Sequence, residues 1–178
     1  MLITPEYKKL LEQEHLTTHW GTTSYFRKDY ILKVIKKYNK TIILDYGSGQ
    51  GSFKKLIDSD KNLYPYTVIE YEPGIPTLSN PPNPCEFVLC TDVLEHVEPN
   101  CIENVLDDLK RVVLDIGLFT ISCQPAHRIL QDGRNAHLII ESPDWWLEKL
   151  KIRFNIEFET HNSKGLTVVV RSKNNGNV

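Results

Sequence analysis

Residues 41–51 read Thr-Ile-Ile-Leu-Asp-Tyr-Gly-Ser-Gly-Gln-Gly, and this stretch decides the fold. Its first part, residues 41–46, is a short apolar run rich in β-branched side chains, which is typical of a buried strand. The glycines that follow let the backbone turn tightly and approach a ligand closely. Residues 51–59 then favour a helix, whose first amides would point at that ligand. The stretch therefore predicts a strand, a ligand-binding turn and a helix.

The rest of the chain alternates strands with helices. Further strands are predicted at residues 66–70, 87–91, 117–123, 154–160 and 166–171. Helices are predicted at residues 5–15, 25–38, 101–113 and 142–151. This alternation predicts an α/β fold with a doubly wound, mostly parallel sheet that binds ligands at the carboxyl ends of its strands. The last two strands flank a turn at residues 162–165 and predict a closing antiparallel hairpin.

Composition and charge exclude some classes of protein. The chain of 178 residues has a formal net charge of −2, whereas proteins that grip nucleic acid by bulk charge are usually basic. No apolar run reaches the length of a membrane span, so we expect a cytoplasmic protein without membrane contact. Its four cysteines are expected to be reduced and mostly buried, with a zinc site built from Cys85, Cys90 and a histidine as the alternative.

Two carboxylates narrow the class of ligand. Glu70 ends the strand after the glycine turn, where a carboxylate can accept two hydrogen bonds from a ribose diol. Asp45 comes just before the first glycine, where it would repel the diphosphate of a nicotinamide or flavin dinucleotide but attract the ammonium group of S-adenosylmethionine. Ser52 also stands where a dinucleotide motif would have its third glycine. Both observations favour S-adenosylmethionine over a dinucleotide.

A third block, residues 90–97, reads Cys-Thr-Asp-Val-Leu-Glu-His-Val. Together with Asp45-x-Gly47-x-Gly49-x-Gly51 and Glu70, it resembles the signature blocks of the class I S-adenosylmethionine-dependent methyltransferases, over roughly residues 41–125. The resemblance implies S-adenosylmethionine as the cofactor and agrees with the closing hairpin. The cofactor-binding residues that we predict in these blocks are Asp45, Tyr46, Gly47, Gly49, Gly51, Glu70, Thr91, Asp92 and Leu94, the last three along the methionine and ribose of the cofactor.

The chain departs from the family between Glu70 and residue 87, where the family usually has a helix and a further strand. Prolines crowd residues 73–84 and predict an extended loop instead, and therefore a trimmed sheet. We expect Tyr71 to pack against the adenine, with an exposed loop tyrosine as the alternative. Trp20 is predicted to cover the cofactor as part of an N-terminal lid, or else to belong to the core.

Candidate residues for the methyl acceptor follow the third and fourth strands. His96 is predicted to act as a general base, or else to hydrogen-bond a loop carbonyl. Glu95 is interpreted as a helix cap. The loop at residues 124–137 supplies further candidates, although a salt-bridged loop around Asp132-Gly133 would explain its polarity as well. Its predicted catalytic and substrate-binding residues are His127, His137, Arg128, Arg134 and Asn135. No metal site is expected.

These observations predict a methyltransferase that acts on an oxygen or nitrogen atom of a small molecule, such as a sugar or metabolite. A nucleic-acid methyltransferase and a non-catalytic cofactor-binding subunit are the alternatives, and a nicotinamide oxidoreductase is disfavoured by Asp45. We divide the chain into an N-terminal helical arm or lid (1–40), an S-adenosylmethionine-binding catalytic domain (41–172) and a frayed tail (173–178).

Overall fold

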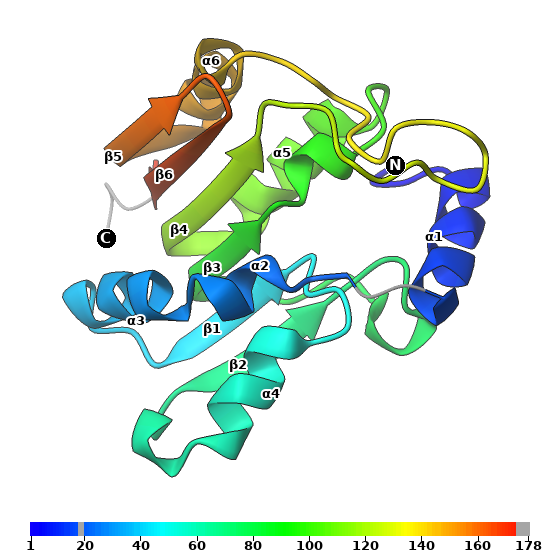
Figure 1. Cartoon of the computed structure of the whole chain (residues 1–178). Helices are drawn as coiled ribbons and strands as arrows, with labels where there is room; N and C mark the ends of the chain where they lie inside the picture. The colour runs from blue at the N-terminus through cyan, green and yellow to red at the C-terminus, as the bar shows by residue number, and fades with distance from the viewer. Residues whose placement is uncertain (18–19, 174–178) are drawn as a thin grey trace.

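The computed structural model describes residues 1–17 and 20–173 (Figure 1). Nearly all of the predicted tail, residues 174–178, lies outside these described residues. The helices are α1 (Pro5–Thr17), α2 (Thr23–Phe26), α3 (Lys28–Lys37), α4 (Ser52–Ser59), α5 (Ile102–Val112) and α6 (Pro143–Arg153). The strands are β1 (Ile42–Tyr46), β2 (Thr67–Tyr71), β3 (Cys85–Thr91), β4 (Val113–Ser122), β5 (Phe154–Asn162) and β6 (Gly165–Ser172).

The strands form one six-stranded sheet in the order β2-β1-β3-β4-β6-β5. The first four strands of this order run parallel, whereas β6 is antiparallel to both β4 and β5. The predicted α/β class, the mostly parallel sheet and the closing hairpin are therefore confirmed. The chain runs from β1 to β2 on one side of β1 and then crosses over to β3 on its other side. The strand order therefore reverses at β1, and such sheets bind ligands at the carboxyl ends of the strands that flank this switch point.

The sheet ends at β2 and is trimmed as predicted. Between β2 and β3, residues 72–84 contain only a 3-10 turn, η2 (Pro76–Leu78), where the family has a helix and a further strand. Prolines at positions 73, 76, 81, 82 and 84 explain this, because proline has no N–H to donate to a neighbouring strand. The loop therefore passes the edge of the sheet without joining it.

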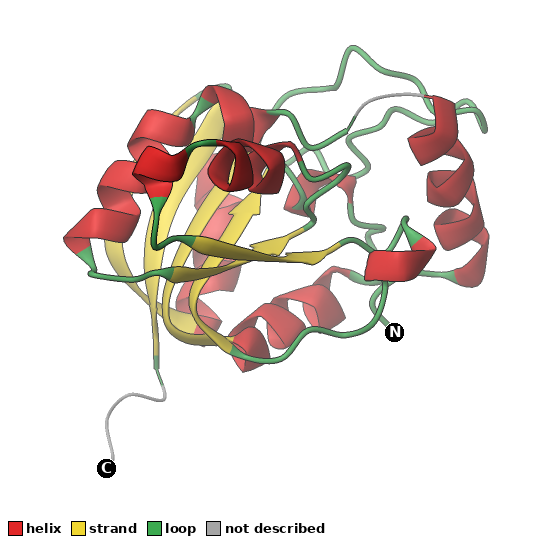
Figure 2. Cartoon of the chain, turned by 90° about the horizontal axis from the view of Figure 1, so that it is seen from below, coloured by secondary structure: helices red, strands yellow, loops and turns green. Residues whose placement is uncertain are grey.

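Helices cover both faces of the sheet (Figure 2). On one face, α5 and α6 bury residues such as Leu106 and Trp146, both 0% exposed. On the other face, α3 and α4 bury residues such as Ile35 and Phe53, also 0% exposed. Burying each side chain of this size stabilises the folded state by roughly 1.5–3 kcal/mol. The packed sheet therefore holds the loops at its carboxyl edge in place.

Two helix predictions need correction. The predicted helix 25–38 is interrupted at Arg27, which separates α2 from α3. The segment after β3 was expected to open a helix at Glu95, but Leu94–His96 forms only a 3-10 turn, η3, and α5 begins at Ile102. Glu95 is therefore not a helix cap: its carboxylate accepts a hydrogen bond from the backbone N–H of Ser122 at the end of β4, at 2.7 Å.

The N-terminal helix α1 crosses the carboxyl edge of the sheet and lies beside the loop 124–137 (Figure 1). The Tyr7 hydroxyl donates to the His96 carbonyl at 3.0 Å. The backbone N–H and the hydroxyl of Thr4 donate to the two carboxylate oxygens of Glu98, at 2.9 and 2.8 Å. These contacts, all to η3 or its neighbours, place the start of the chain over the strand ends.

Candidate functional site

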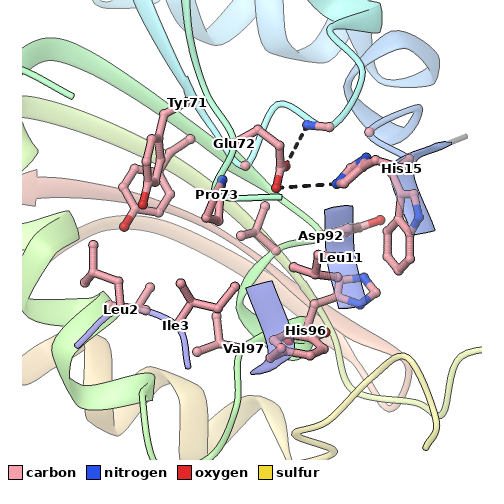
Figure 3. A pocket seen from close by; sticks show the side chains of 18 of the residues that line it. Leu2, Ile3, Leu11, His15, Tyr71, Glu72, Pro73, Asp92, His96 and Val97 are labelled. Atoms are coloured by element: carbon pink, nitrogen blue, oxygen red, sulfur yellow. Dashed lines mark hydrogen bonds and ion pairs between the residues drawn. The ribbon is translucent and has the colours of Figure 1, made fainter. Parts of the chain in front are cut away.

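A cavity of about 760 Å³, part of it open to solvent, lies at the carboxyl ends of β1, β2 and β3 (Figure 3). The glycine turn after β1 and the ends of β2 and β3 form one side of the cavity. The opposite side comes from the N-terminal arm, through Leu2, Ile3, Tyr7, Leu11, His15, Trp20 and Gly21.

The glycine turn has a backbone that only glycine adopts easily. Gly47, Gly49 and Gly51 have φ angles of +81°, +55° and +72°. A Cβ atom at Gly47 would lie 2.4 Å from the Val93 side chain, and one at Gly51 would lie 2.1 Å from a carboxylate oxygen of Glu70. Gly47 and Gly49 line the cavity, whereas Gly51 does not. The turn thus presents bare backbone to the cavity at Gly47 and Gly49.

Asp45 is buried at the end of β1, with 1% of its surface exposed, and does not line the cavity. Neither of its carboxylate oxygens has a hydrogen-bond partner within the described parts of the chain. Burial, followed by the charges of Glu70 and Glu72, raises the pKa of Asp45 to about 7. A buried carboxylate without a donor is costly, so this site suits a cationic or N–H-donating group that the protein itself does not supply.

Glu72 is a carboxylate that lines the cavity and that was not predicted from the sequence. Glu72 is buried, and its carboxylate accepts from the N–H of Gly49 at 3.0 Å and of Gly74 at 2.9 Å. It also lies 3.5 Å from Nε2 of His15 on α1 (Figure 3). Glu70 is still paired within the sheet, opposite Asp45, and does not line the cavity. Had the predicted strand ended at Tyr71, as β2 does, Glu72 would have been the first residue after the strand and the expected carboxylate at the cavity.

Two tyrosines line the cavity below Glu72. The rings of Tyr46 and Tyr71 are 4.7 Å apart, and both residues are buried. The Tyr46 hydroxyl donates to Asp108 at 2.9 Å. Burial, followed by the charge of Asp108, raises the pKa of Tyr71 to about 12, so its hydroxyl stays protonated. Tyr71 is thus not the exposed loop residue of the alternative interpretation.

The end of β3 contributes one of its three predicted cofactor residues to the cavity. Asp92 lines it and has a left-handed backbone, with φ of +53°. Its two carboxylate oxygens accept from the hydroxyls of Thr23 at 2.7 Å and Thr120 at 3.0 Å. Thr91 is hydrogen-bonded to Ser24, and Leu94 is completely buried; neither lines the cavity.

Two histidines meet at the next part of the wall. Nδ1 of His96 is 2.7 Å from the carbonyl of Ala136, and Nδ1 of His137 is 2.5 Å from the carbonyl of Gln124. The rings are 4.8 Å apart, and only His96 lines the cavity. Burial, followed by the neighbouring His137, lowers the pKa of His96 to about 4, so His96 is neutral at physiological pH. The structure thus shows the hydrogen bond between His96 and a loop carbonyl that the alternative interpretation predicted. Because Nδ1 makes this bond, Nε2 is the nitrogen of the neutral ring that could accept a proton.

Trp20 lines the cavity, and its ring lies 5.1 Å from that of His96. The guanidinium group of Arg128 stacks on the Trp20 ring, 4.5 Å from a ring centroid. A Cβ atom at Gly49 would lie 2.7 Å from the Trp20 backbone, so the arm packs directly on the glycine turn. This is the position that a lid would occupy.

The remaining acceptor candidates in the loop 124–137 do not line the cavity. Arg134 pairs with Asp132 at 2.6 Å and stacks on the Tyr7 ring. The Asn135 side chain bonds both the N–H and the carbonyl of Ala126. His127 is exposed. These contacts agree with the alternative interpretation, in which polar residues hold the loop together.

No cysteine belongs to a metal-ligand cluster among the residues that the structure describes, so the zinc alternative with Cys85 and Cys90 gains no support. All four cysteines are free and buried, as expected. The described helices are all too short or too polar to cross a membrane.

Comparison with protein-family models gives no match, and comparison with curated proteins gives none either. Solved structures do match. The 1,6-didemethyltoxoflavin-N1-methyltransferase of Burkholderia thailandensis, bound to S-adenosylhomocysteine, is similar over 97% of this chain and 92% of its own, with a TM-score of 0.61 and 14% identity. The N-methyltransferase NodS of Bradyrhizobium japonicum, also bound to S-adenosylhomocysteine, matches over 92% and 96%, with a TM-score of 0.57 and 11% identity.

An rRNA methylase of Escherichia coli matches over 96% of this chain and 78% of its own, with a TM-score of 0.57 and 14% identity. The names of two of these proteins indicate different acceptors, 1,6-didemethyltoxoflavin and rRNA, and all three are only 11–14% identical to this chain. What they share with it is the arrangement of the chain. The protein therefore has the fold of the class I S-adenosylmethionine-dependent methyltransferases.

Proposed function

We propose that this protein is an S-adenosylmethionine-dependent methyltransferase that methylates an oxygen or nitrogen atom of a small molecule. The observation that carries the proposal is the buried, unpartnered carboxylate of Asp45 next to a glycine turn and the cavity-facing carboxylate of Glu72. The structural neighbours, two of them bound to S-adenosylhomocysteine, support the same cofactor.

The described residues fit the parts of the cofactor. Glu72 at the end of β2 would hold the ribose diol, because a carboxylate accepts two hydrogen bonds there. Asp45 would balance the ammonium group, directly or through water. The apolar lining contributed by Tyr71, Val93 and Val97 suits the adenine. When bound, S-adenosylmethionine supplies an electrophilic methyl group for direct displacement.

The acceptor would lie in the part of the cavity that His96 and Trp20 line together, where the arm covers the strand ends. Methyl transfer depends mainly on the positioning of the nucleophile and the exclusion of water. Trp20 and α1 exclude water at this place. The unprotonated Nε2 of His96 offers a polar contact for an acceptor hydroxyl or amine.

A small acceptor is favoured over nucleic acid. The cavity is closed on one side by the arm, and the chain has a net charge of −2. Binding of nucleic acid depends on contacts of basic residues with phosphates. Arg128 and Arg134, the arginines predicted to bind the substrate, stack on Trp20 and Tyr7 instead.

Two measurements test the proposal. Isothermal titration calorimetry should show one equivalent of S-adenosylhomocysteine bound, and the same titration with NAD should show none. Incubation with methyl-tritiated S-adenosylmethionine and either a small-metabolite extract or total RNA should place the label in the small-metabolite fraction. Binding of NAD alone would refute the cofactor assignment, whereas label in RNA alone would refute the acceptor assignment.

A further inference from the structure

Three side chains with metal-ligand atoms converge on the wall of the cavity that η3 shares with the loop 124–137. One carboxylate oxygen of Glu95 and one ring nitrogen each of His96 and His137 all lie within 4.8 Å of one another. The sequence gives no hint of this group, because His137 is far along the chain and reaches the other two only through the loop. His96 also lines the cavity, so the group borders the ligand space.

The two histidines are oriented as metal ligands usually are. A backbone carbonyl can only accept, so Nδ1 carries the proton in both rings, toward Ala136 and Gln124. The lone pair of each ring is therefore on Nε2. Metal-ligating histidines almost always donate their other N–H to a carbonyl or carboxylate, which fixes the tautomer and the orientation of the ring. Both rings have this arrangement.

Glu95 supplies an oxygen that nothing else uses. Its Oε1 accepts from the N–H of Ser122, which fixes the carboxylate group at the end of β4. Its Oε2 is buried and has no hydrogen-bond partner within the described chain. If Glu95 had only a structural role, leaving this second oxygen without a hydrogen bond would lower the free energy of unfolding by roughly 1–3 kcal/mol. A cation next to it would remove that cost.

We propose that Glu95, His96 and His137 form a binding site for a divalent transition-metal ion. Two imidazoles and one carboxylate suit ions such as Zn²⁺, Mn²⁺, Fe²⁺ or Co²⁺, whereas Ca²⁺ and Mg²⁺ prefer oxygen ligands. Bonds of about 2.0–2.2 Å to one ion bring ligand atoms to roughly 3–4 Å from each other. The ligand atoms lie within 4.8 Å of one another, so an ion would have to draw them together by at most about 1–2 Å. Three protein ligands leave further coordination positions open, and His96 is the ligand that also lines the cavity.

Asp92 is the next carboxylate in this region, but it is not a ligand of the site. Both of its oxygens accept hydrogen bonds from threonine hydroxyls. Asp92 would instead add a second negative charge close to the ion, since it is the main charged neighbour of Glu95. The negative charge of Asp92 favours a divalent cation at this place.

The site would also define the class of acceptor, a statement that rests on the proposed function. A divalent ion beside the cavity lowers the pKa of a coordinated hydroxyl. The hydroxyl proton is released to solvent, the oxygen forms its bond to the methyl carbon, and the bond between that carbon and sulfur breaks to leave a neutral thioether. An oxygen nucleophile, such as a diol or a phenol, is thus favoured over an amine.

Metal binding can be measured without activity, with Co²⁺ as the probe. The metal-free protein is titrated with CoCl₂ while the visible d–d absorption is recorded, and folding is checked by circular dichroism. We expect one equivalent of Co²⁺ to bind, and Zn²⁺ to displace it. The His137→Ala variant should bind Co²⁺ at least about 100-fold more weakly, because even loss of an outer hydrogen bond costs 10–100-fold. Added imidazole should restore part of the absorption.

The His161→Ala variant is the matched control, because His161 is exposed on β5, away from the cavity. No stoichiometric binding, equal affinities of the wild type and His137→Ala, or a thiolate-to-cobalt charge-transfer band would each overturn the metal site. Binding of S-adenosylhomocysteine is titrated in parallel. Cofactor binding without Co²⁺ binding refutes only the metal site, and Co²⁺ binding without cofactor binding refutes only the proposed function.

Discussion

Replacement of Glu72 by glutamine should separate the roles of the two glutamates around β2. The carboxylate of Glu72 faces the cavity and is held in place by the N–H groups of Gly49 and Gly74. Glutamine keeps one acceptor oxygen and nearly the same volume, but it loses the charge and one of the two acceptors for a diol. The carboxylate of Glu70, by contrast, lies against Gly51 and outside the cavity.

The size of the effect follows from the type of hydrogen bond. A hydrogen bond to a charged group contributes about 1.5–3 kcal/mol, and each 1.4 kcal/mol is a factor of about ten in Kd. Glu72→Gln should therefore weaken the binding of S-adenosylhomocysteine by about 10- to 150-fold. Glu70→Gln, which leaves the lining of the cavity intact, should change the affinity by less than about threefold.

Isothermal titration calorimetry of both variants with S-adenosylhomocysteine provides the comparison, and thermal melts followed by circular dichroism show whether both are folded. Equal losses of affinity in the two variants, or a larger loss in Glu70→Gln, would show that the assignment of Glu72 to the ribose is wrong. A folded Glu72→Gln variant with wild-type affinity would show the same.

Three further changes probe the glycine turn, the buried aspartate and the arm. Gly51→Ala should lower the free energy of unfolding by about 1–3 kcal/mol, measured by urea titration, because its φ is +72° and the new Cβ would lie 2.1 Å from Glu70. Since the pKa of Asp45 is raised to about 7, the cofactor-free protein should lose stability as pH rises from about 4 to 7, by about 4 kcal/mol at most, and Asp45→Asn should flatten this part of the curve. Tyr7→Phe removes the 3.0 Å bond to the His96 carbonyl, so limited proteolysis should cut within residues 1–17 several-fold faster, for a loss of about 1 kcal/mol.

Each of these changes has a control or a contradicting outcome. Gly133 has a φ of +85° and nothing within 4 Å of an added Cβ, so Gly133→Ala isolates backbone strain and should cost less than Gly51→Ala. A pH profile of Asp45→Asn that parallels the wild type would contradict the raised pKa. Tyr25 is largely exposed, and a Tyr25→Phe variant that is cleaved as fast as Tyr7→Phe would contradict the anchoring role of the Tyr7 hydroxyl.

The order of elements could be predicted from sequence because each signal is local. The apolar run before Gly47, the glycine turn itself and the paired strands around residues 162–165 all depend on residues within a few positions of each other. The prolines after β2 similarly forbid a strand wherever the rest of the chain lies. From these features the sheet, its trimmed edge and its closing hairpin could be predicted.

The composition of the site depended on finer or longer-range information. β2 ends at Tyr71, one residue later than predicted, and the carboxylate at the cavity is Glu72, the first residue after the strand, instead of Glu70. The polar residues of the loop 124–137 were predicted to bind a substrate. Arg128 and Arg134 instead stack on Trp20 and Tyr7 of the arm, which precede them by more than a hundred positions in the chain. Pairings over such distances are set by the fold and leave no local pattern in the sequence.

The proline loop also has a consequence for engineering. The loop is tied locally, since the N–H of Glu72 donates to the carbonyl of Leu78 at 3.1 Å, and only Pro73 of its residues beyond Glu72 borders the cavity. Lengthening a surface connection costs little, about 0.6 kcal/mol for each doubling. Insertions after Leu78 should thus be tolerated, which makes this edge a convenient place to graft a recognition segment while the sheet and the cavity keep their shape.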